Sequence, residues 1–206
     1  ATFSLPAKSL AEVAAVAEGA ALGAYSFTEF RGSTKADFKA PLKVITIHSK
    51  LASTTDAKAA VSRAAIVAKY TYLVRDLINT PPSHLTPDSF TKKMAAVVKA
   101  AGGAKAGLKV SIWDEKQLKS QGFGGIIGVG QGSANPPRLL HISYTPKSKA
   151  AKRYAYIGKG ITFDTGGLAL KPAAGMEAMK SDMSGAAAVS AAVVAIAELN
   201  LNVAID

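Results

Sequence analysis

Cysteine is absent from the sequence, and this excludes both a disulfide framework and a thiolate metal site. The absence agrees with a reducing cytosol but does not require one. No stretch reaches the roughly 18 uninterrupted apolar residues that a membrane-spanning helix needs, so we predict that the chain does not span a membrane. The sequence also has no G-x-S-x-G elbow, which leaves a serine hydrolase with little support.

Histidine is scarce, and the first residues do not resemble a secretory signal. His48, His84 and His141 lie far apart and match no H-E-x-x-H zinc motif, so we expect surface or satisfied core histidines. Residues 1–8 lack the basic start and the long apolar core of a secretory signal, and they contain no initiator Met. We interpret this start as internal or processed.

The overall composition is that of an ordinary folded protein. Apolar residues make up 49% of the 206 positions and charged residues 19%, which argues against a disordered chain. This length accommodates one domain, or one domain with part of another, and it is enough to bury a real core.

The formal net charge of +11 comes mostly from single lysines in the middle of the chain. A surface that adsorbs nucleic acid is one interpretation. We favour a solvated lysine-rich surface, because no aromatic or arginine residues of the kind that read nucleic acid are interleaved with the charge. The lysines concerned are Lys92, Lys93, Lys99, Lys105, Lys109, Lys116 and Lys119.

Hydrophobic periodicity predicts alternating helices and strands, which is typical of an α/β protein. Helices are expected over residues 8–24, 56–78, 86–101, 114–120 and 186–197. Strands are expected over residues 42–48, 108–113, 139–144, 153–157 and 201–205. We expect the strands at 139–144 and 153–157 to pair as a hairpin across a polar turn.

From these elements we predict the end of a small N-terminal α/β domain over residues 1–55, a connector helix over 56–80, and the first part of a catalytic domain over 81–206. The catalytic domain is expected to be a mixed-sheet α/β domain with helices on both faces. The helix at 186–197 has one polar residue, Ser190, so it must lie inside the molecule or under another domain. We interpret the chain as an excised or incomplete piece of a longer protein.

The most informative feature is a group of charges among glycines and apolar residues. Residues 156–171 read Y-I-G-K-G-I-T-F-D-T-G-G-L-A-L-K, and residues 180–186 read K-S-D-M-S-G-A. Lys159, Asp164, Lys171 and Asp182 therefore lie on predicted strand ends and turns, where ionised groups need compensation. Carboxylate oxygens are hard ligands for divalent ions, so a cluster of divalent ions is one way to compensate these charges.

Simpler interpretations remain open for each of these residues. Lys159 and Asp164 are spaced to form a salt bridge, and Asp182 is placed to cap the following helix. The glycines after Thr165 allow a phosphate cradle, but no complete phosphate-binding motif accompanies them. Met176 and Met179, three residues apart, are also consistent with core packing.

The block over residues 158–185 closely resembles the leucyl aminopeptidase (cytosol aminopeptidase) family of two-metal exopeptidases. The likeness extends back through residues 128–133 and 79–82 to residues 19–25. The resemblance implies that Lys159, Asp164 and Asp182 are metal ligands and that Lys171 is a catalytic lysine. It further implies that Met179 lines the pocket for the substrate's N-terminal side chain.

The implied activity is the release of leucine-like N-terminal residues from peptides in the cytoplasm. Two divalent ions, Mn²⁺ or Zn²⁺, activate a water molecule that attacks the scissile carbonyl, and Lys171 stabilises the oxyanion. The family also implies a homohexamer. The alternatives are a nucleic-acid-binding member, which we do not favour, and a catalytically inactive scaffold.

The family's second motif, N-T-D-A-E-G-R, does not occur in these residues. It supplies two further carboxylate ligands and an arginine. We therefore expect the 206 residues alone to be inactive.

Overall fold

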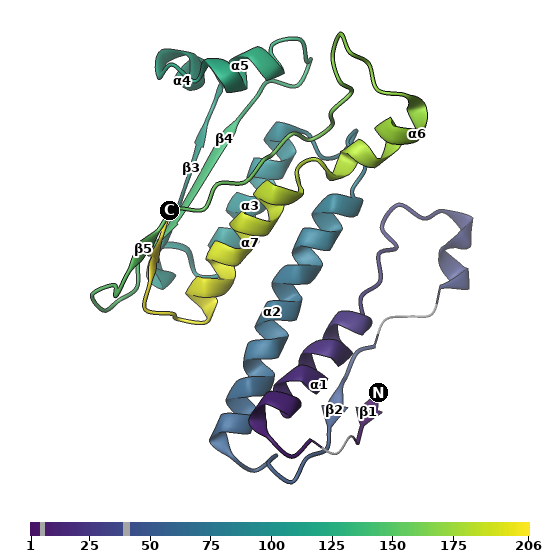
Figure 1. Ribbon diagram of the computed structural model, residues 1–206, viewed down its shortest axis with the longest axis vertical. Helices are drawn as coiled ribbons and strands as arrows, with labels where there is room; N and C mark the ends of the chain where they lie inside the picture. The colour runs from purple at the N-terminus through teal and green to yellow at the C-terminus, as the bar shows by residue number, and fades with distance from the viewer. Residues whose placement is uncertain (5–6, 39–41) are drawn as a thin grey trace. The chain divides into compact units, whose positions relative to one another are not determined.

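The computed structural model describes residues 1–4, 7–38 and 42–206 (Figure 1). The chain divides into two compact units, Ala1–Asp76 and Leu77–Asp206. The long helix α2 (Thr55–Asn79) begins in the first unit and ends in the second. It occupies the segment predicted to be helical, whereas its role as a connector and the predicted domain boundaries stay predictions.

The first unit combines two helices with a short parallel ladder. β1 (Thr2–Phe3) pairs with β2 (Thr46–Ile47), so only the end of the strand predicted over residues 42–48 forms a ladder. Residue 41, just before it, lies outside the described residues. Helix α1 (Leu10–Gly23) begins at a capping box made by Ser9 and Glu12, and η1 (Ser33–Asp37) is a short 3-10 turn.

Side chains of α2 hold the end of α1. The Tyr25 hydroxyl donates to Asp76 Oδ1 at 2.8 Å, and the Arg75 guanidinium lies 3.8 Å from the centre of the Tyr25 ring. The Tyr72 hydroxyl donates to the carbonyl oxygen of Ala21. A carbonyl at the end of α1 is thereby satisfied by a side chain of α2.

The second unit is built on a mixed four-stranded sheet in the order β3-β4-β6-β5. β3 (Leu108–Trp113) and β4 (Leu139–Tyr144) are antiparallel along their whole length. β6 (Ala204–Ile205) is antiparallel to β4 and parallel to β5 (Arg153–Tyr154). The expectation of a mixed-sheet α/β fold is confirmed.

The predicted hairpin between residues 139–144 and 153–157 is wrong, because β6 lies between the two strands. Asp206 donates its N–H to Tyr154 and accepts from the N–H of Tyr156, at 2.9 and 2.8 Å. Alternation of apolar residues identifies strands but does not identify their partners. The strand near the end of the sequence is therefore paired on both sides.

Two helices of the second unit form within the ranges 86–101 and 114–120 that were expected to be helical. α3 (Pro87–Ala100) follows the Thr86 cap and α4 (Glu115–Ser120) follows Asp114. Two short helices, α5 (Gly124–Gly130) and α6 (Ala173–Met176), were not predicted, since glycine and alanine show no clear helical face. The 3-10 turn η3 (Glu177–Ser181) then leads towards α7 (Ser184–Glu198).

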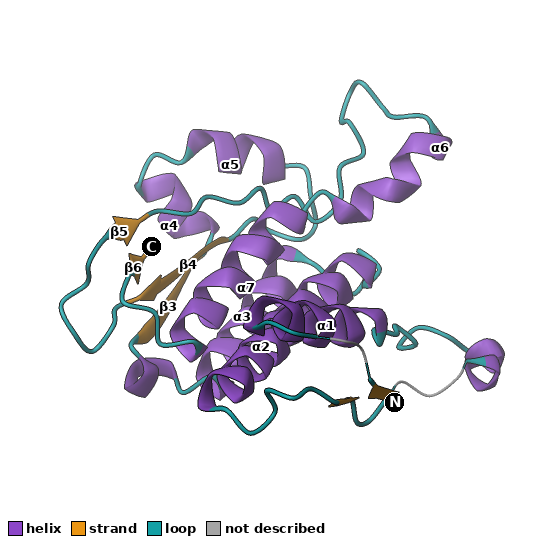
Figure 2. Cartoon of the chain, turned by 60° about the horizontal axis from the view of Figure 1, so that its bottom comes forward, coloured by secondary structure: helices purple, strands orange, loops and turns teal. Residues whose placement is uncertain are grey.

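Helix α7 is a core helix, as its lack of a polar face predicted. It contacts β4 and α3, while α3 contacts β3, and Figure 2 shows both helices along the strands. Its Ala187 and Val194 are fully buried. By length and composition alone the helical stretch Ala173–Glu198 is long and apolar enough to cross a membrane, but buried core helices meet the same criterion.

Candidate metal and catalytic site

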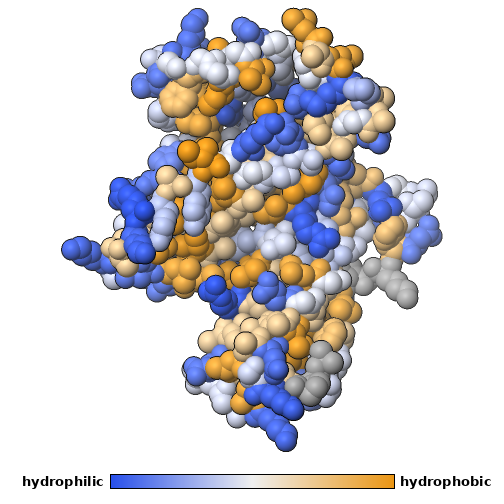
Figure 3. Space-filling view, viewed as in Figure 1, coloured by the Kyte–Doolittle hydropathy of each residue, from blue (hydrophilic) through white to orange (hydrophobic). Residues whose placement is uncertain are grey.

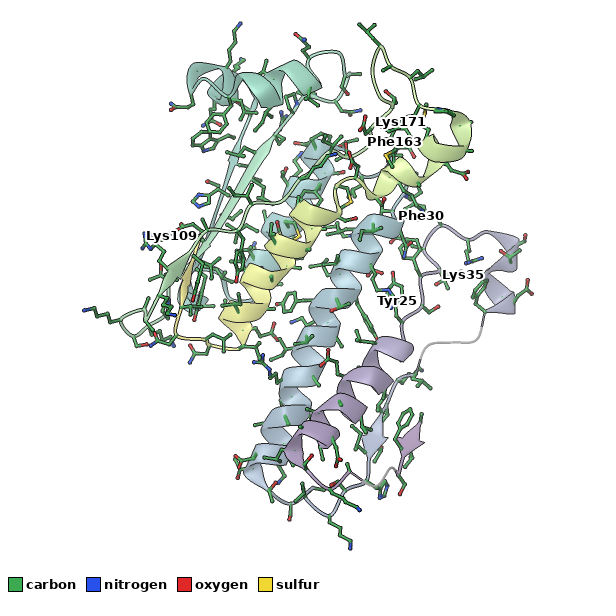
Figure 4. All side chains as sticks on the ribbon, viewed as in Figure 1. Tyr25, Phe30, Lys35, Lys109, Phe163 and Lys171 are labelled. Atoms are coloured by element: carbon green, nitrogen blue, oxygen red, sulfur yellow. The ribbon has the colours of Figure 1, made fainter. Side chains whose placement is uncertain are left out.

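Four charged side chains lie on the segment between β5 and α7, all within the second unit. Lys159 and Asp164 belong to the irregular stretch after β5. Lys171 lies on the loop leading into α6 (Figure 4), and Asp182 lies between η3 and α7. The structure brings them together as two lysine–carboxylate pairs.

Glycines let the backbone at Lys159 pack directly against the start of α7. A Cβ atom on Gly158 would lie 2.4 Å from the carbonyl oxygen of Gly185, and one on Gly185 would lie 2.9 Å from the nitrogen of Lys159. The N–H of Ala186 donates to the Lys159 carbonyl at 2.8 Å. This backbone contact places Lys159 beside Asp182.

Lys159 and Asp182 form the first pair, with Nζ 2.8 Å from Oδ2. The Asp182 side chain is only 17% exposed, against 56% for Lys159. Its Oδ2 is shielded from solvent and has no hydrogen-bond partner, so the short contact is a charge pair without hydrogen-bond alignment. A buried carboxylate oxygen that makes no hydrogen bond can still coordinate a cation.

Asp164 and Lys171 form the second pair, with Nζ 2.8 Å from Oδ2. The other oxygen, Oδ1, accepts the N–H of Gly166 at 2.8 Å. The Lys171 N–H donates to the Thr165 carbonyl at 2.9 Å and closes the loop between the two side chains. Gly166 has φ +90°, a conformation that favours glycine.

The pKa of Asp164 lies below its ordinary value. The hydrogen bond from Lys171 is the largest cause, and the N–H of Gly166 is the next. Partial burial opposes them, while the positive charges of Lys171 and Lys159 add to the lowering. Asp164 is therefore a carboxylate at neutral pH, the form that binds cations.

Two of the simpler interpretations are wrong. Lys159 pairs with Asp182 and not with Asp164, because the Gly158–Gly185 contact brings the start of α7 to it. Asp182 does not cap α7, whose N-cap residue is Met183 and makes no side-chain cap hydrogen bond. The N–H of Gly166, the glycine after Thr165, donates a hydrogen bond to the Asp164 carboxylate.

Met179 is partly buried, and its carbonyl accepts the N–H of Asp182 at 3.2 Å. It therefore lies next to the site in the chain and is tied to it through the backbone. Met183, four residues later, is fully buried and belongs to the core. The substrate-pocket role of Met179 stays a prediction.

The donor set suits a divalent cation. Across residues 1–4, 7–38 and 42–206, no group of three or more His, Cys, Asp or Glu side chains is placed to hold a metal. The set here instead combines two carboxylates with lysine amines, and the buried Oδ2 of Asp182 makes no hydrogen bond and faces the Lys159 amine. Carboxylate oxygens are the ligands preferred by hard divalent ions.

The sequence interpretation missed the glycines that assemble the site. Gly158 and Gly185 flank Lys159 and Asp182 in the chain, but a glycine beside a charged residue is an ordinary turn signal. Their importance is a property of the packed structure, since each meets the other's backbone.

Residues 72–206 match the cytosol aminopeptidase family, catalytic domain. Proteins named "Probable cytosol aminopeptidase" from Leifsonia xyli and Streptomyces avermitilis are 49% and 50% identical over 201 and 205 residues. Each alignment covers 98% of this chain and 39% of the relative. The chain thus spans about two fifths of the length of these relatives.

Solved structures agree with this match. The bottromycin maturation enzyme BotP in complex with Mn superposes with a TM-score of 0.81 at 34% identity, over 99% of this chain and 42% of that one. A leucyl aminopeptidase from Trypanosoma cruzi superposes with a TM-score of 0.81 at 28% identity, over 99% of this chain and 38% of that one. The chain belongs to the cytosol aminopeptidase family.

Proposed function

We propose that residues 1–206 contribute to a metal-dependent aminopeptidase that releases leucine-like N-terminal residues from peptides. The observation that carries the proposal is the Oδ2 atom of Asp182, which is shielded from solvent and faces only a lysine amine. The ionised Asp164 within the same segment supports it. The relatives' names, all aminopeptidases, agree with the activity.

Lys159, Asp164 and Asp182 are the residues that would hold the metal. Divalent ions bound there supply Lewis acidity, which polarises a peptide carbonyl and lowers the pKa of an attacking water. We propose two ions, Mn²⁺ or Zn²⁺, in accordance with the family resemblance; the BotP structure contains Mn.

Lys171 is proposed to stabilise the oxyanion that develops on the scissile carbonyl. The Lys171 side chain is 31% exposed, so its ammonium can leave Asp164 and contact a substrate oxygen instead. Asp164 keeps the N–H of Gly166 on its other oxygen, so the carboxylate stays oriented when the lysine turns away. A donor aimed at a developing negative charge is among the strongest catalytic devices.

Further parts of the proposal depend on residues outside this sequence. The N-T-D-A-E-G-R motif is absent from the 206 residues, so we propose that the remaining ligands come from elsewhere in the active protein. We also propose Met179 as a lining of the pocket for the N-terminal side chain, a homohexameric assembly and a cytoplasmic location.

The test uses the full-length protein that carries these residues. Asp182→Asn and Asp164→Asn remove one charged ligand each with little change in volume, and each should lower metal affinity by at least about 10- to 100-fold. Bound metal is measured by mass spectrometry of the purified protein, and activity with leucyl p-nitroanilide. Asp114→Asn, at the cap of α4, is the control.

The proposal fails if both site variants keep full metal content and activity. Normal metal content without peptidase activity in the wild type would instead favour the inactive scaffold. The nucleic-acid-binding alternative is not favoured, because the relatives from Leifsonia xyli and Streptomyces avermitilis carry aminopeptidase names.

A further inference from the structure

The Asp182 carboxylate depends on the backbone for its orientation. Its Oδ2 is shielded from solvent and makes no hydrogen bond, so this oxygen is held by the charge pair with Lys159. The residue lies where η3 ends and α7 begins, with φ −71° and ψ −2°. The peptide groups on either side of Asp182 therefore decide where the carboxylate points.

The α-helical hydrogen-bond ladder does not fix this turn. In a regular helix the N–H of residue 186 would bond to the carbonyl of residue 182. Here the N–H of Ala186 donates to the Lys159 carbonyl at 2.8 Å instead, and the N–H of Ala187 bonds to the Met183 carbonyl at 3.1 Å. Met183, the N-cap residue, makes no side-chain cap hydrogen bond. The turn that carries Asp182 therefore needs a separate support.

Ser184 provides that support. Its hydroxyl donates a partly buried hydrogen bond to the Ser181 carbonyl. This carbonyl and the N–H of Asp182 belong to the same planar peptide group, and the N–H donates to the Met179 carbonyl at 3.2 Å. The peptide group before Asp182 is thus held at both of its polar ends, which restricts the rotation that would swing the carboxylate.

Ser184 is the one source of a side-chain hydrogen bond in the first turn of α7. Residues 184–187 read S-G-A-A, and glycine and alanine side chains have neither donor nor acceptor atoms. Figure 3 shows hydrophobic and near-neutral colour where α7 lies, in agreement with its composition. Loss of the Ser184 hydroxyl would therefore leave the Ser181 carbonyl without a side-chain donor on this turn.

We propose that Ser184 is a positioning residue of the metal site, which holds the Ser181–Asp182 peptide group so that the Asp182 carboxylate is directed to the metal. The inference rests on the proposed function, because that function makes Asp182 a ligand. Loss of a group that orients a metal ligand lowers affinity by about 10- to 100-fold. For Ser184→Ala we expect the lower end, about tenfold, because the N–H of Asp182 keeps its bond to Met179.

The experiment measures metal binding without turnover. Mn²⁺ is titrated into the metal-stripped full-length protein, and free Mn²⁺ is followed by electron paramagnetic resonance. Ser184→Ala should raise the Kd about tenfold, whereas Ser184→Thr, which retains a hydroxyl, should keep the wild-type Kd. Ser120→Ala is the matched control, because the Ser120 hydroxyl donates to the Gln117 carbonyl at 2.9 Å with the same spacing on another helix, α4.

A double-mutant cycle separates positioning from a general effect on the fold. If Ser184 acts through the Asp182 carboxylate, Ser184→Ala should weaken Mn²⁺ binding in the wild type but not further in an Asp182→Asn background. A merely structural role would weaken binding by the same factor in both backgrounds. Thermal unfolding of the metal-free variants, followed by circular dichroism, confirms that each is folded at the temperature of the titration.

Three results would overturn the role of Ser184 alone. They are an unchanged Kd in Ser184→Ala, an equal rise in Ser184→Ala and Ser184→Thr, and an equal effect of Ser184→Ala in both backgrounds. Failure of the proposed function gives a different result, since Asp182→Asn by itself would then bind Mn²⁺ as tightly as the wild type. That result would overturn the assignment of Asp182 and, with it, this inference.

Discussion

Gly158→Ala tests whether close backbone packing assembles the site. The added Cβ would lie 2.4 Å from the Gly185 oxygen and 2.7 Å from Cα of Ala186, while real Cβ contacts essentially never fall below 3.0 Å. The segment and the start of α7 must therefore move apart by roughly half an ångström or more. The 2.8 Å hydrogen bond from Ala186 to the Lys159 carbonyl lies in the path of that movement.

The cost follows from these contacts. Overpacking costs about 1–3 kcal/mol, and loss of the hydrogen bond costs about 0.5–1.5 kcal/mol. Together they predict a loss of about 1.5–4.5 kcal/mol in the free energy of unfolding. For a protein of 150–250 residues that corresponds to a fall in Tm of roughly 3–18 °C, and the fall should be smaller in a longer full-length protein. Separation of Lys159 from Asp182 should also reduce metal binding.

The assays are thermal unfolding followed by circular dichroism and the metal content of the purified full-length protein. Gly175→Ala is the matched control, because a Cβ there meets nothing within 4 Å and Gly175 lies in α6. Unchanged Tm and metal content in Gly158→Ala would show that the backbone contact is dispensable, and our account of how Lys159 reaches Asp182 would be refuted.

Three further predictions concern catalysis, acid stability and the isolated chain. Lys171→Ala should lower kcat on a leucyl amide by roughly 10²- to 10³-fold without lowering bound metal, since the variant removes a cation that competes for Asp164; simultaneous loss of metal would show that Lys171 is a ligand or a structural group. The pKa of Glu12 is lowered mainly by backbone N–H groups of Lys8 and Ser9, so its contribution to stability is present above the ordinary pKa of about 4.3 and disappears as pH falls through the lower folded pKa. Glu12→Gln should therefore remove part of the decline of Tm in acid, and an identical pH profile would contradict this role for the capping box. Residues 1–206 alone should bind a hydrophobic dye through exposed side chains such as Ile157 and Leu168 and should not hydrolyse leucinamide with added Mn²⁺ or Zn²⁺, whereas metal-dependent activity would show that the site is complete within them.

Local sequence signals located most elements of the fold. Helices expected over residues 86–101 and 114–120 form as α3 and α4, and the side chains of Thr86 and Asp114 cap them, because capping depends on residues within one turn. The nearly uniform apolarity of α7 predicted a core helix, because a helix without a polar face must be buried. The hairpin failed because strand pairing is a long-range choice, and β6 reaches the space beside β5 from 50 residues further along the chain.

For the candidate site, too, the sequence predicted one part and the tertiary structure decided the other. The sequence by itself identified Lys159, Asp164, Lys171 and Asp182, because charged residues among glycines and apolar residues require a partner whatever the fold. Only the tertiary structure decided how they pair. Gly158 and Gly185 allow a backbone contact between segments more than 20 residues apart. Because of this contact Asp182 pairs with Lys159, and Asp164 pairs with Lys171. Such a contact depends on packed backbone distances that no local sequence pattern encodes.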